Sequence, residues 1–330
     1  MAPFLLPDRP LTTLDAWRAA AGGAGLDVAR KLGPEATIEE VQASGLRGRG
    51  GAGFPTAAKW AGVARAKGTH RYLVANGAEG EPGTFKDRTL LRRNPYQLIE
   101  GVAIAAMSVG AAEAFIALKA SFTREVGRLA GALGEMLDAG LAGEVPIRIV
   151  TGPEEYLFGE EKALLEVIEG RDPLPRLLPP YIHGLFSTAP QMGWTATDLR
   201  AGHAGRHESN PTVVNNVETL SNVPHILVNG PAWFRGRGTP SSPGTVVCTV
   251  VGDVVEDGVV EVDMGTSLAH LIEHGAGGPL PGRRVRAIWS GVANPPLGAD
   301  HLGTPITYED FAAIGAGLGS AGFVVYDGTA

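Results

Sequence analysis

The stretch Leu46–Trp60, LRGRGGAGFPTAAKW, decides how this chain is interpreted. It places four glycines and two arginines ahead of a segment, Lys59–Lys67, that we interpret as a helix. Glycine has no Cβ, so such a loop can adopt positive φ and approach a ligand closely. The amino end of a following helix would favour an anion there, typically a phosphate. A glycine-rich turn that only lets two helices pack is the alternative, and the loop alone does not separate the two.

The composition of the chain limits its function. The 330 residues carry a net charge of -7 without a basic run, which argues against nucleic acid as a partner. The apolar runs are too short to span a bilayer and the first residues do not form a signal peptide, so we expect a cytoplasmic protein with no direct membrane insertion. The single cysteine, Cys248, excludes an intrachain disulfide and any cluster held by four cysteines of this sequence.

The first two thirds of the chain alternate between predicted strands and helices. Apolar runs at 71–76, 111–120 and 144–150 predict strands, and segments at 95–107 and 123–137 have helical periodicity. Thr37 and Glu40 have the spacing of a capping box, which predicts a helix start at Thr37. This alternation predicts an α/β domain over residues 1–240.

The sequence changes character after a stretch rich in glycine, proline and serine at 235–244, which we interpret as a linker. The strand-like segments 245–252 and 259–262 flank a turn and predict a hairpin. A helix capped by Thr266 and ending at Gly275, then a strand over 284–291, complete the pattern. This order predicts a small β-grasp-like domain over residues 241–330.

Three further segments carry polar residues in suggestive positions. NGAEGEPGTFKDR (76–88) places Glu79 and Glu81 at the end of a strand, where α/β sheets bind ligands. EEYLFGEEKALLEVIEG (154–170) places Glu160 and Glu161 in the first turn of a helix, and PTVVNNVETLSNVPH (211–225) places two asparagines before another. Each segment taken singly is better explained by surface or helix-capping chemistry than by a site.

Taken together and in this order, these motifs resemble the NADH- and FMN-binding flavoprotein subunit of respiratory complex I, which is the F-subunit family of NADH-quinone oxidoreductase. The resemblance extends to the diaphorase subunits of NAD-linked hydrogenases and formate dehydrogenases and covers about residues 46–325. It implies a Rossmann-like α/β FMN-binding domain followed by an SLBB domain, a ubiquitin-like β-grasp module. It also implies that FMN accepts hydride from NADH and passes electrons to an iron–sulfur or other electron-accepting protein.

The resemblance implies one cavity that holds FMN with NADH stacked on the flavin. The residues expected at the FMN phosphate and the dinucleotide are Gly48, Arg49, Gly50, Gly51, Gly53 and Lys59. Those expected around the flavin are Asn76, Glu79, Gly80, Tyr156, Gly159, Glu160, Asn215, Asn216 and Thr219. Phe54, Glu81 and Glu161 are expected at the nucleotide. Because the cofactors carry the chemistry, we expect no catalytic side chain and no metal, with Glu79 and Glu161 as candidate orienters of the nicotinamide.

The sequence departs from the family pattern mainly on the nucleotide side. Ala78 replaces an acidic residue, residues 61–63 lack an expected aromatic, and Leu178 replaces a basic residue. Lys162 and Tyr181 replace the usual Thr and Phe. The segment 184–211 is longer than in the family and contains two histidines and two arginines, namely His203, His207, Arg200 and Arg206. These residues are candidates for the lost phosphate contacts, and the alternative is a solvated loop with no such role.

The sequence stops at Ala330, ahead of the region where the family has four cluster-binding cysteines. We therefore expect the C-terminal [4Fe–4S] helical domain to be absent and electrons to leave through a partner. Two alternatives stay open. One is an FMN electron carrier that does not use NAD(H), and the other is a non-catalytic binding or assembly module with a degenerate cofactor site.

Overall fold

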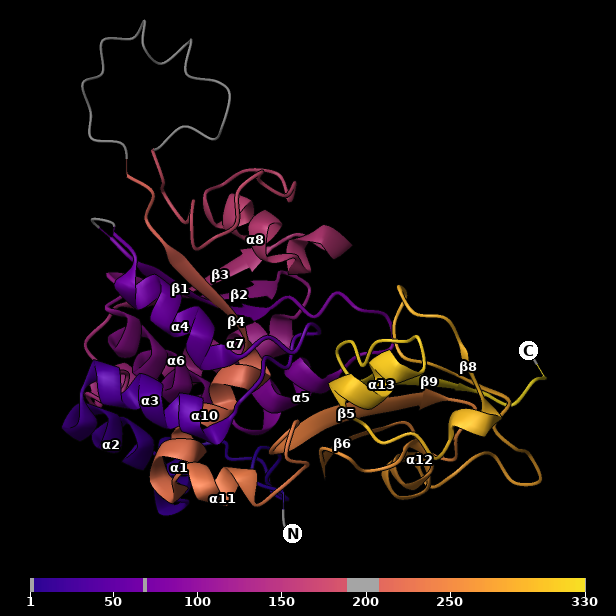
Figure 1. Ribbon diagram of the computed structural model, residues 1–330. Helices are drawn as coiled ribbons and strands as arrows, with labels where there is room; N and C mark the ends of the chain where they lie inside the picture. Colours follow the sequence, from indigo (N-terminus) through magenta and orange to yellow (C-terminus); the bar gives the residue numbers. More distant parts are fainter. Residues whose placement is uncertain (1–2, 68–69, 189–207, 330) are drawn as a thin grey trace, which may run out of the picture.

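The computed structural model describes residues 3–67, 70–188 and 208–329 and contains two β-sheets (Figure 1). The strands of the first sheet lie within residues 72–216, in the part of the chain that we call the N-terminal unit. Those of the second lie within residues 245–326, in the part that we call the second unit. An α/β fold with a parallel sheet, as predicted, is confirmed for the N-terminal unit. Within the described ranges, no helix is both long and apolar enough to cross a bilayer.

The first sheet has four parallel strands in the order β3-β2-β1-β4. Their bounds are Tyr72–Gly77 (β1), Glu113–Lys119 (β2), Ile147–Gly152 (β3) and Thr212–Asn216 (β4). Side chains alternate between the two faces, so Leu73 and Ala75 join one apolar cluster while Val74 joins another. Both faces are covered, which is why these strands read as continuous apolar runs.

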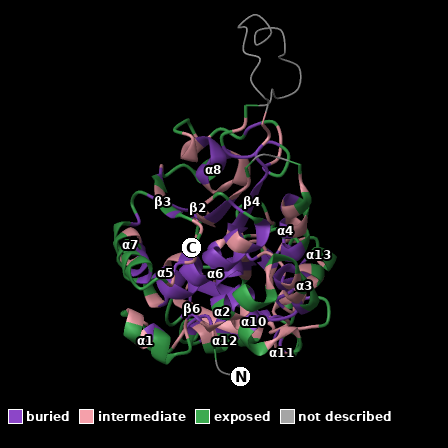
Figure 2. Ribbon diagram, turned by 90° about the vertical axis from the view of Figure 1, so that its left-hand side faces the viewer, coloured by how far each residue is buried: buried purple, intermediate pink, exposed green. Residues whose placement is uncertain are grey.

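Helix α6 packs at the centre of the larger apolar cluster, on one face of this sheet, and Figure 2 shows it in the colour of buried residues. It begins at Pro95, whose preceding residue Asn94 accepts a hydrogen bond from Gln97 N, and it ends at Gly110 with φ of 65°. The helices of the N-terminal unit are α1 (Leu14–Ala19), α2 (Ala24–Leu32), α3 (Pro34–Ser44), α4 (Thr56–Arg65), α5 (Lys86–Arg93), α6 (Pro95–Val109), α7 (Thr123–Asp138), α8 (Glu161–Ile168), α10 (Val217–Asn229) and α11 (Pro231–Arg235). Helix α8 covers the opposite face, where Leu164 and Leu165 pack under Val74.

The second sheet is mixed, in the order β6-β5-β9-β7-β8. Its elements are β5 (Thr245–Gly252), β6 (Gly258–Asp263), α12 (Leu268–Ala276), β7 (Ala287–Trp289), β8 (Leu297–Gly298), a 3-10 turn (Ala299–His301), α13 (Tyr308–Ala313) and β9 (Gly322–Tyr326). The predicted hairpin is confirmed, because β5 and β6 pair antiparallel. The central strand β9 runs parallel to β5 and antiparallel to β7.

Two predicted helix caps are wrong by a few residues. Helix α3 begins at Pro34 with Gly33 as its N-cap, so Thr37 lies inside the helix and donates its hydroxyl to Gly33 O. Proline suits the first helical position because its missing N–H would be unpaired there in any case. In α12 the cap is Ser267 rather than Thr266, and its hydroxyl accepts from His270 N.

The segment 235–244 is packed between the units rather than free. Arg237 is bonded to Asp263, and the buried Ser242 donates its hydroxyl to Glu309. The N-terminal segment also bridges the units, since Glu261 accepts three successive backbone N–H groups, from Phe4, Leu5 and Leu6. Buried polar contacts of this kind hold the two units in one arrangement.

Candidate functional site

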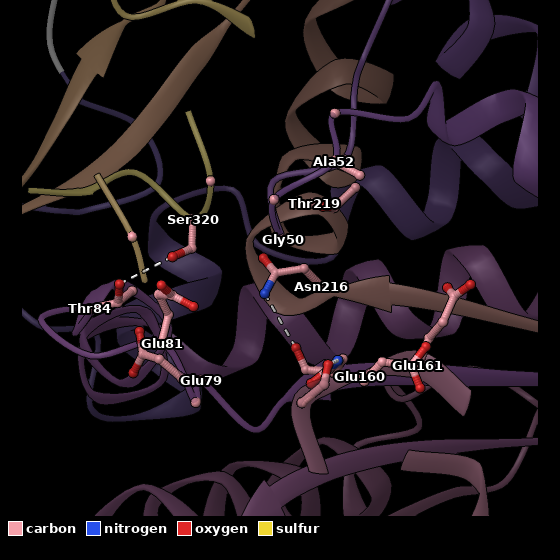
Figure 3. Close-up of a pocket in the computed structure, with 18 of the residues that line it drawn as sticks. Gly50, Ala52, Glu79, Glu81, Thr84, Glu160, Glu161, Asn216, Thr219 and Ser320 are labelled. Atoms are coloured by element: carbon pink, nitrogen blue, oxygen red, sulfur yellow. Dashed lines mark hydrogen bonds between the residues drawn. The ribbon is translucent and has the colours of Figure 1, made fainter. Parts of the chain in front are cut away.

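A cavity of about 620 Å³ lies where the carboxyl ends of β1 and β4 meet the second unit (Figure 3). It is lined by Gly48, Gly50, Gly51, Ala52, Gly53, Phe54, Thr56, Lys59, Asn76, Glu79, Gly80, Glu81, Thr84, Asp87, Tyr156, Gly159, Glu160, Glu161, Val214, Asn215, Asn216, Thr219, Ser290, Gly291, Ala293, Asn294, Gly319 and Ser320. Every sequence-predicted site residue except Arg49 is among them.

The position of the cavity follows from the topology of the first sheet. From β1 the chain proceeds to β2 and β3 on one side, then returns to place β4 on the other side of β1. The strand order therefore reverses between β1 and β4. Open α/β sheets bind ligands at the carboxyl ends of strands at such a switch point.

Four helices direct their amino ends at this region, and three of them are capped by side chains. Glu160 accepts from Lys162 N and Ala163 N at the start of α8, at 2.9 and 3.0 Å. Asn216 accepts from Glu218 N at the start of α10, at 3.0 Å. These caps confirm that both residues occupy the helix starts predicted from sequence.

The start of α5 is capped from outside the helix by Glu79. Its carboxylate accepts from Asp87 N at 2.6 Å, from Arg88 N at 3.2 Å and from the Arg88 guanidinium at 2.8 Å. Glu79 has a positive φ of 39°, a backbone conformation that non-glycine residues rarely adopt. Burial, followed by the neighbouring Asp87, raises the pKa of Glu79 to about 7.

Helix α4 is the exception, because its N-cap is Pro55 and no side chain bonds its first N–H groups. The Thr56 hydroxyl oxygen at its start is buried and has no hydrogen-bond partner among the described groups. Thr56 lines the cavity, while its own N–H donates to Leu46 O at 3.0 Å. An uncapped helix amino end is a binding site for an anion.

The glycine loop lies against α10 and α13 with little spare room. A Cβ on Gly50 would lie 3.0 Å from the Asn216 Cβ. Gly53 has φ of 62°, and a Cβ there would lie 2.7 Å from the Tyr308 ring. The loop is closed by a hydrogen bond from Gly48 N to Phe54 O of 2.8 Å. Glycine is therefore required here by backbone conformation as well as by close approach.

Arg49 does not present its side chain to the cavity as predicted. Its guanidinium is buried and donates to three backbone carbonyls, Thr245 O, Pro243 O and Arg47 O, each at 3.0 Å. Its backbone N–H donates to the Thr219 hydroxyl at 2.8 Å. Arg49 thus fastens the glycine loop to the second unit, a role that no local sequence pattern indicates.

The cationic group that does reach the cavity is Lys59. Its ammonium lies 2.8 Å from Glu161 and donates to Val214 O at 3.0 Å. Asn76 donates to Gly159 O, and the Asn215 side chain accepts from the Trp60 indole. These bonds join the glycine-loop side of the cavity to the α8 side.

Glu81 bridges the rim of the cavity. One carboxylate oxygen accepts from the Tyr156 hydroxyl at 2.7 Å and the other from Val292 N of the second unit at 2.6 Å. The bond to Glu81, followed by partial burial, raises the pKa of Tyr156 to about 12.

A buried ion cluster supports the floor of the cavity. The Lys86 ammonium lies 2.6 Å from Asp87, 2.8 Å from Glu218 and 3.1 Å from the Asn216 side-chain oxygen. Asn216 in turn donates to Asp87 at 2.7 Å. Although burial alone lowers the pKa of Lys86, the neighbouring carboxylates Asp87 and Glu218 raise it overall, so the ammonium stays charged.

Sequence reasoning missed the contribution of the second unit. Two of its loops supply cavity-lining residues, namely Ser290, Gly291, Ala293, Asn294, Gly319 and Ser320. The only available signal was a pair of segments rich in small residues: SGVAN (290–294), at the end of a predicted strand, and GLGSAG (317–322). The four residues His203, His207, Arg200 and Arg206 lie outside the described residues.

The chain is similar to known proteins in both sequence and fold. Residues 41–225 match the family model described as the Nuo51 FMN-binding domain. The chain is 40% identical over 321 residues to the NADH-quinone oxidoreductase F 2 subunit of Rhizobium meliloti, covering 93% of this chain and 71% of that protein. It is 38% identical over 328 residues to the corresponding F subunit of Streptomyces coelicolor, covering 96% and 68%.

A solved structure, that of an NAD+-reducing [NiFe]-hydrogenase in the air-oxidised state, superposes with a TM-score of 0.78 at 34% identity. The match covers 97% of this chain and 52% of the hydrogenase chain, so the present chain spans about half of that protein's length. The resemblance inferred from the motifs is confirmed. The chain belongs to the Nuo51 FMN-binding family, which includes the F subunits of NADH-quinone oxidoreductases.

Proposed function

We propose that this chain is an FMN-dependent oxidoreductase subunit that accepts hydride from NADH and passes electrons to a partner protein. The observation that carries the proposal is the cavity at the β1–β4 switch point. It gathers the glycine loop, the start of α4, the carboxylates of residues 76–88 and 154–170, and the side-chain amides of Asn215 and Asn216. Its family supports both FMN binding and NADH oxidation.

The residues present fit FMN on a structural criterion. A flavin mononucleotide carries one phosphate, and α4 offers the one uncapped helix end among the four that meet the described cavity. The unpartnered Thr56 hydroxyl and the close-fitting Gly50 and Gly53 lie beside it. We infer that the phosphate is held there and that Asn215, Asn216 and Thr219 lie along the remainder of the cofactor.

The bound flavin supplies the redox chemistry, and the protein supplies position and electrostatics. Hydride transfer needs the two rings stacked in register, so the task of the chain is orientation and not proton abstraction. Glu79, Glu81 and Glu161 are placed to hold hydroxyl or carboxamide groups of the nucleotide. Of these, Glu161 is paired with Lys59, which limits the repulsion that it exerts on phosphates.

The alternative of an FMN carrier that does not use NAD(H) draws on one observation. Ala78, which replaces an acidic residue of the family pattern, is fully buried and carries no carboxylate at that position. The third hypothesis, a non-catalytic module with a degenerate site, has less support because seventeen of the eighteen predicted binding residues line one cavity.

Several finer features stay predictions. We propose that the second unit is an SLBB-type β-grasp domain, consistent with its hairpin, crossover helix and mixed five-stranded sheet. We also propose that residues 1–330 hold no iron–sulfur cluster, since their single cysteine is buried in β5, and that the electron acceptor is an iron–sulfur or similar protein in the cytoplasm. The boundary between the units near residue 240 is part of the same proposal.

The first test is FMN binding by fluorescence quenching, followed by NADH oxidation with ferricyanide as acceptor. Glu160→Gln with Asn216→Ala should weaken FMN retention, because it alters two capping side chains at the cavity. Ser267→Ala is the matched control, since it removes a helix cap from α12, which does not line the cavity. Stoichiometric FMN in the double variant would show that the flavin lies elsewhere.

A further inference from the structure

The second unit closes one side of the cavity with a surface that we name the C-terminal wall, residues 290–294 and 317–320. The first segment follows β7 and the second precedes β9. Figure 3 shows Ser320 of the wall beside Thr84 and Glu81, on the side of the cavity away from Glu161. The wall is therefore part of the ligand cavity, although it lies more than two hundred residues beyond the glycine loop in sequence.

Asn294 holds the two segments of the wall together. Its side-chain nitrogen donates to Gly317 O at 2.9 Å and to Ser290 O at 3.2 Å, and its side-chain oxygen accepts from Gly317 N at 2.9 Å. Its backbone oxygen accepts from the Trp289 indole at 2.8 Å. A side-chain amide that satisfies groups on both loops fixes their separation.

The wall is also fixed against the rim of the N-terminal unit. Val292 N donates to Glu81 at 2.6 Å, and the Thr84 and Ser320 hydroxyls lie 3.1 Å apart. The backbone packs tightly here, because a Cβ on Gly322 would lie only 2.3 Å from the Thr84 hydroxyl oxygen. The distance between Glu81 and the wall is thus set by packing on both sides.

Burial indicates which ligand this side of the cavity receives. Asn215 and Thr219 at the cavity floor are buried, whereas Tyr156 beside Glu81 is 53% exposed. In the wall, Ser290 is buried, and Val292, which bonds Glu81 but does not itself line the cavity, is 46% exposed. A resident cofactor is retained best at the buried end, while a substrate that exchanges in every turnover needs the open side. The wall and Glu81 therefore face the exchanging nucleotide.

We propose that the C-terminal wall is a binding surface for the nicotinamide nucleotide, and that Asn294 is the positioning residue that holds it opposite Glu81. The inference rests on the proposed function and extends it to the second unit. If the nucleotide binds only when the wall is in this position, then by thermodynamic linkage nucleotide binding also stabilises the contact between the two units.

Hydrogen exchange on the unmodified FMN-loaded protein tests this without turnover. NAD+ is the probe, since it cannot reduce oxidised flavin. FMN alone should protect amides in the glycine loop, and added NAD+ should further protect 290–294 and 317–320. Protection by NAD+ at residues 79–81 with an unchanged wall would overturn the inference and leave the proposed function standing. No NAD+-dependent protection anywhere, with no reduction by NADH, would refute both.

Variants give a second readout. Asn294→Ala should raise the KM for NADH about fivefold, the effect of about one lost hydrogen bond, with FMN content and kcat little changed. Ser320→Asp should raise the KM at least as much, because it adds a negative charge facing an anionic ligand. Ser241→Asp is its control, an exposed position of the same unit that does not line the cavity. A KM unchanged in Ser320→Asp, or raised equally in Ser241→Asp, would overturn the role of the wall.

Discussion

Replacing Lys86 with methionine should destabilise the protein strongly, because the ammonium neutralises two buried carboxylates. The side chain of Lys86 is 1% exposed and that of Glu218 is 0% exposed. Methionine has a similar length but removes the ammonium that contacts both Asp87 and Glu218, which leaves the guanidinium of Arg49 as the other cation that lowers the pKa of Glu218. Breaking a buried ion pair by removing one partner costs about 3–5 kcal/mol of unfolding free energy.

The loss should depend on pH in a definite direction. Burial already raises the pKa of Glu218, and without Lys86 the folded state would favour its protonated form further. Protonation relieves the uncompensated charge, so the difference between Lys86→Met and the unmodified protein should be larger at pH 8 than at pH 5. Adding Glu218→Gln to Lys86→Met should recover part of the loss.

Urea denaturation followed by circular dichroism measures these differences. Lys31→Met is the matched control, since Lys31 is exposed on α2, and surface substitutions of this kind stay within about 0.5 kcal/mol. A loss below about 1 kcal/mol for Lys86→Met, or a loss independent of pH, would refute the argument that this cluster is a desolvated ion network.

Three further predictions concern the cavity and its supports. Burial raises the pKa of Glu79 from 4.5 to about 7, so the folded state binds a proton more tightly than the unfolded state does. The free energy of unfolding should therefore fall by about 3 kcal/mol as the pH rises from 4.5 to 7. Glu79→Gln should flatten this dependence in urea titrations between pH 5 and 8. Gly53→Ala should lower the free energy of unfolding by about 1–2 kcal/mol because of the positive φ alone, and the new Cβ should also clash with Tyr308 and lower FMN affinity. Gly62→Ala, which has open space around it, should be neutral or stabilising in the same assays. Deletion of 241–330 should abolish FMN binding because buried contacts to the second unit are lost, and stoichiometric FMN in the truncated protein would show that the N-terminal unit stands alone.

The last of these predictions reverses an expectation from sequence. The proline- and glycine-rich stretch at 235–244 suggested a linker between separable domains. In the structure, Arg49 donates to Thr245 O and Pro243 O, and Glu218 accepts from Val247 N. Such contacts between a side chain and a backbone group far away in the sequence cannot be predicted from local composition.

Much of the first unit could be predicted, since its strands are continuous apolar runs and its main helices have clear periodicity. Seventeen of the eighteen predicted site residues line one cavity, because they lie in short motifs at the ends of strands and helices, where ligand contacts concentrate. Arg49 was misplaced because an arginine in a glycine loop suggests a phosphate contact, whereas its partners are set by tertiary packing. The C-terminal wall was missed because small residues such as Ser290 and Gly319 carry no local chemical signature.

The most direct test of the account is an anaerobic titration of the FMN-reconstituted protein with NADH, followed in the visible spectrum. The account predicts that the oxidised-flavin band bleaches in proportion to added NADH and is gone at one equivalent per flavin. A bound flavin whose band stays unchanged with excess NADH, but which dithionite reduces, would contradict NADH as the hydride donor.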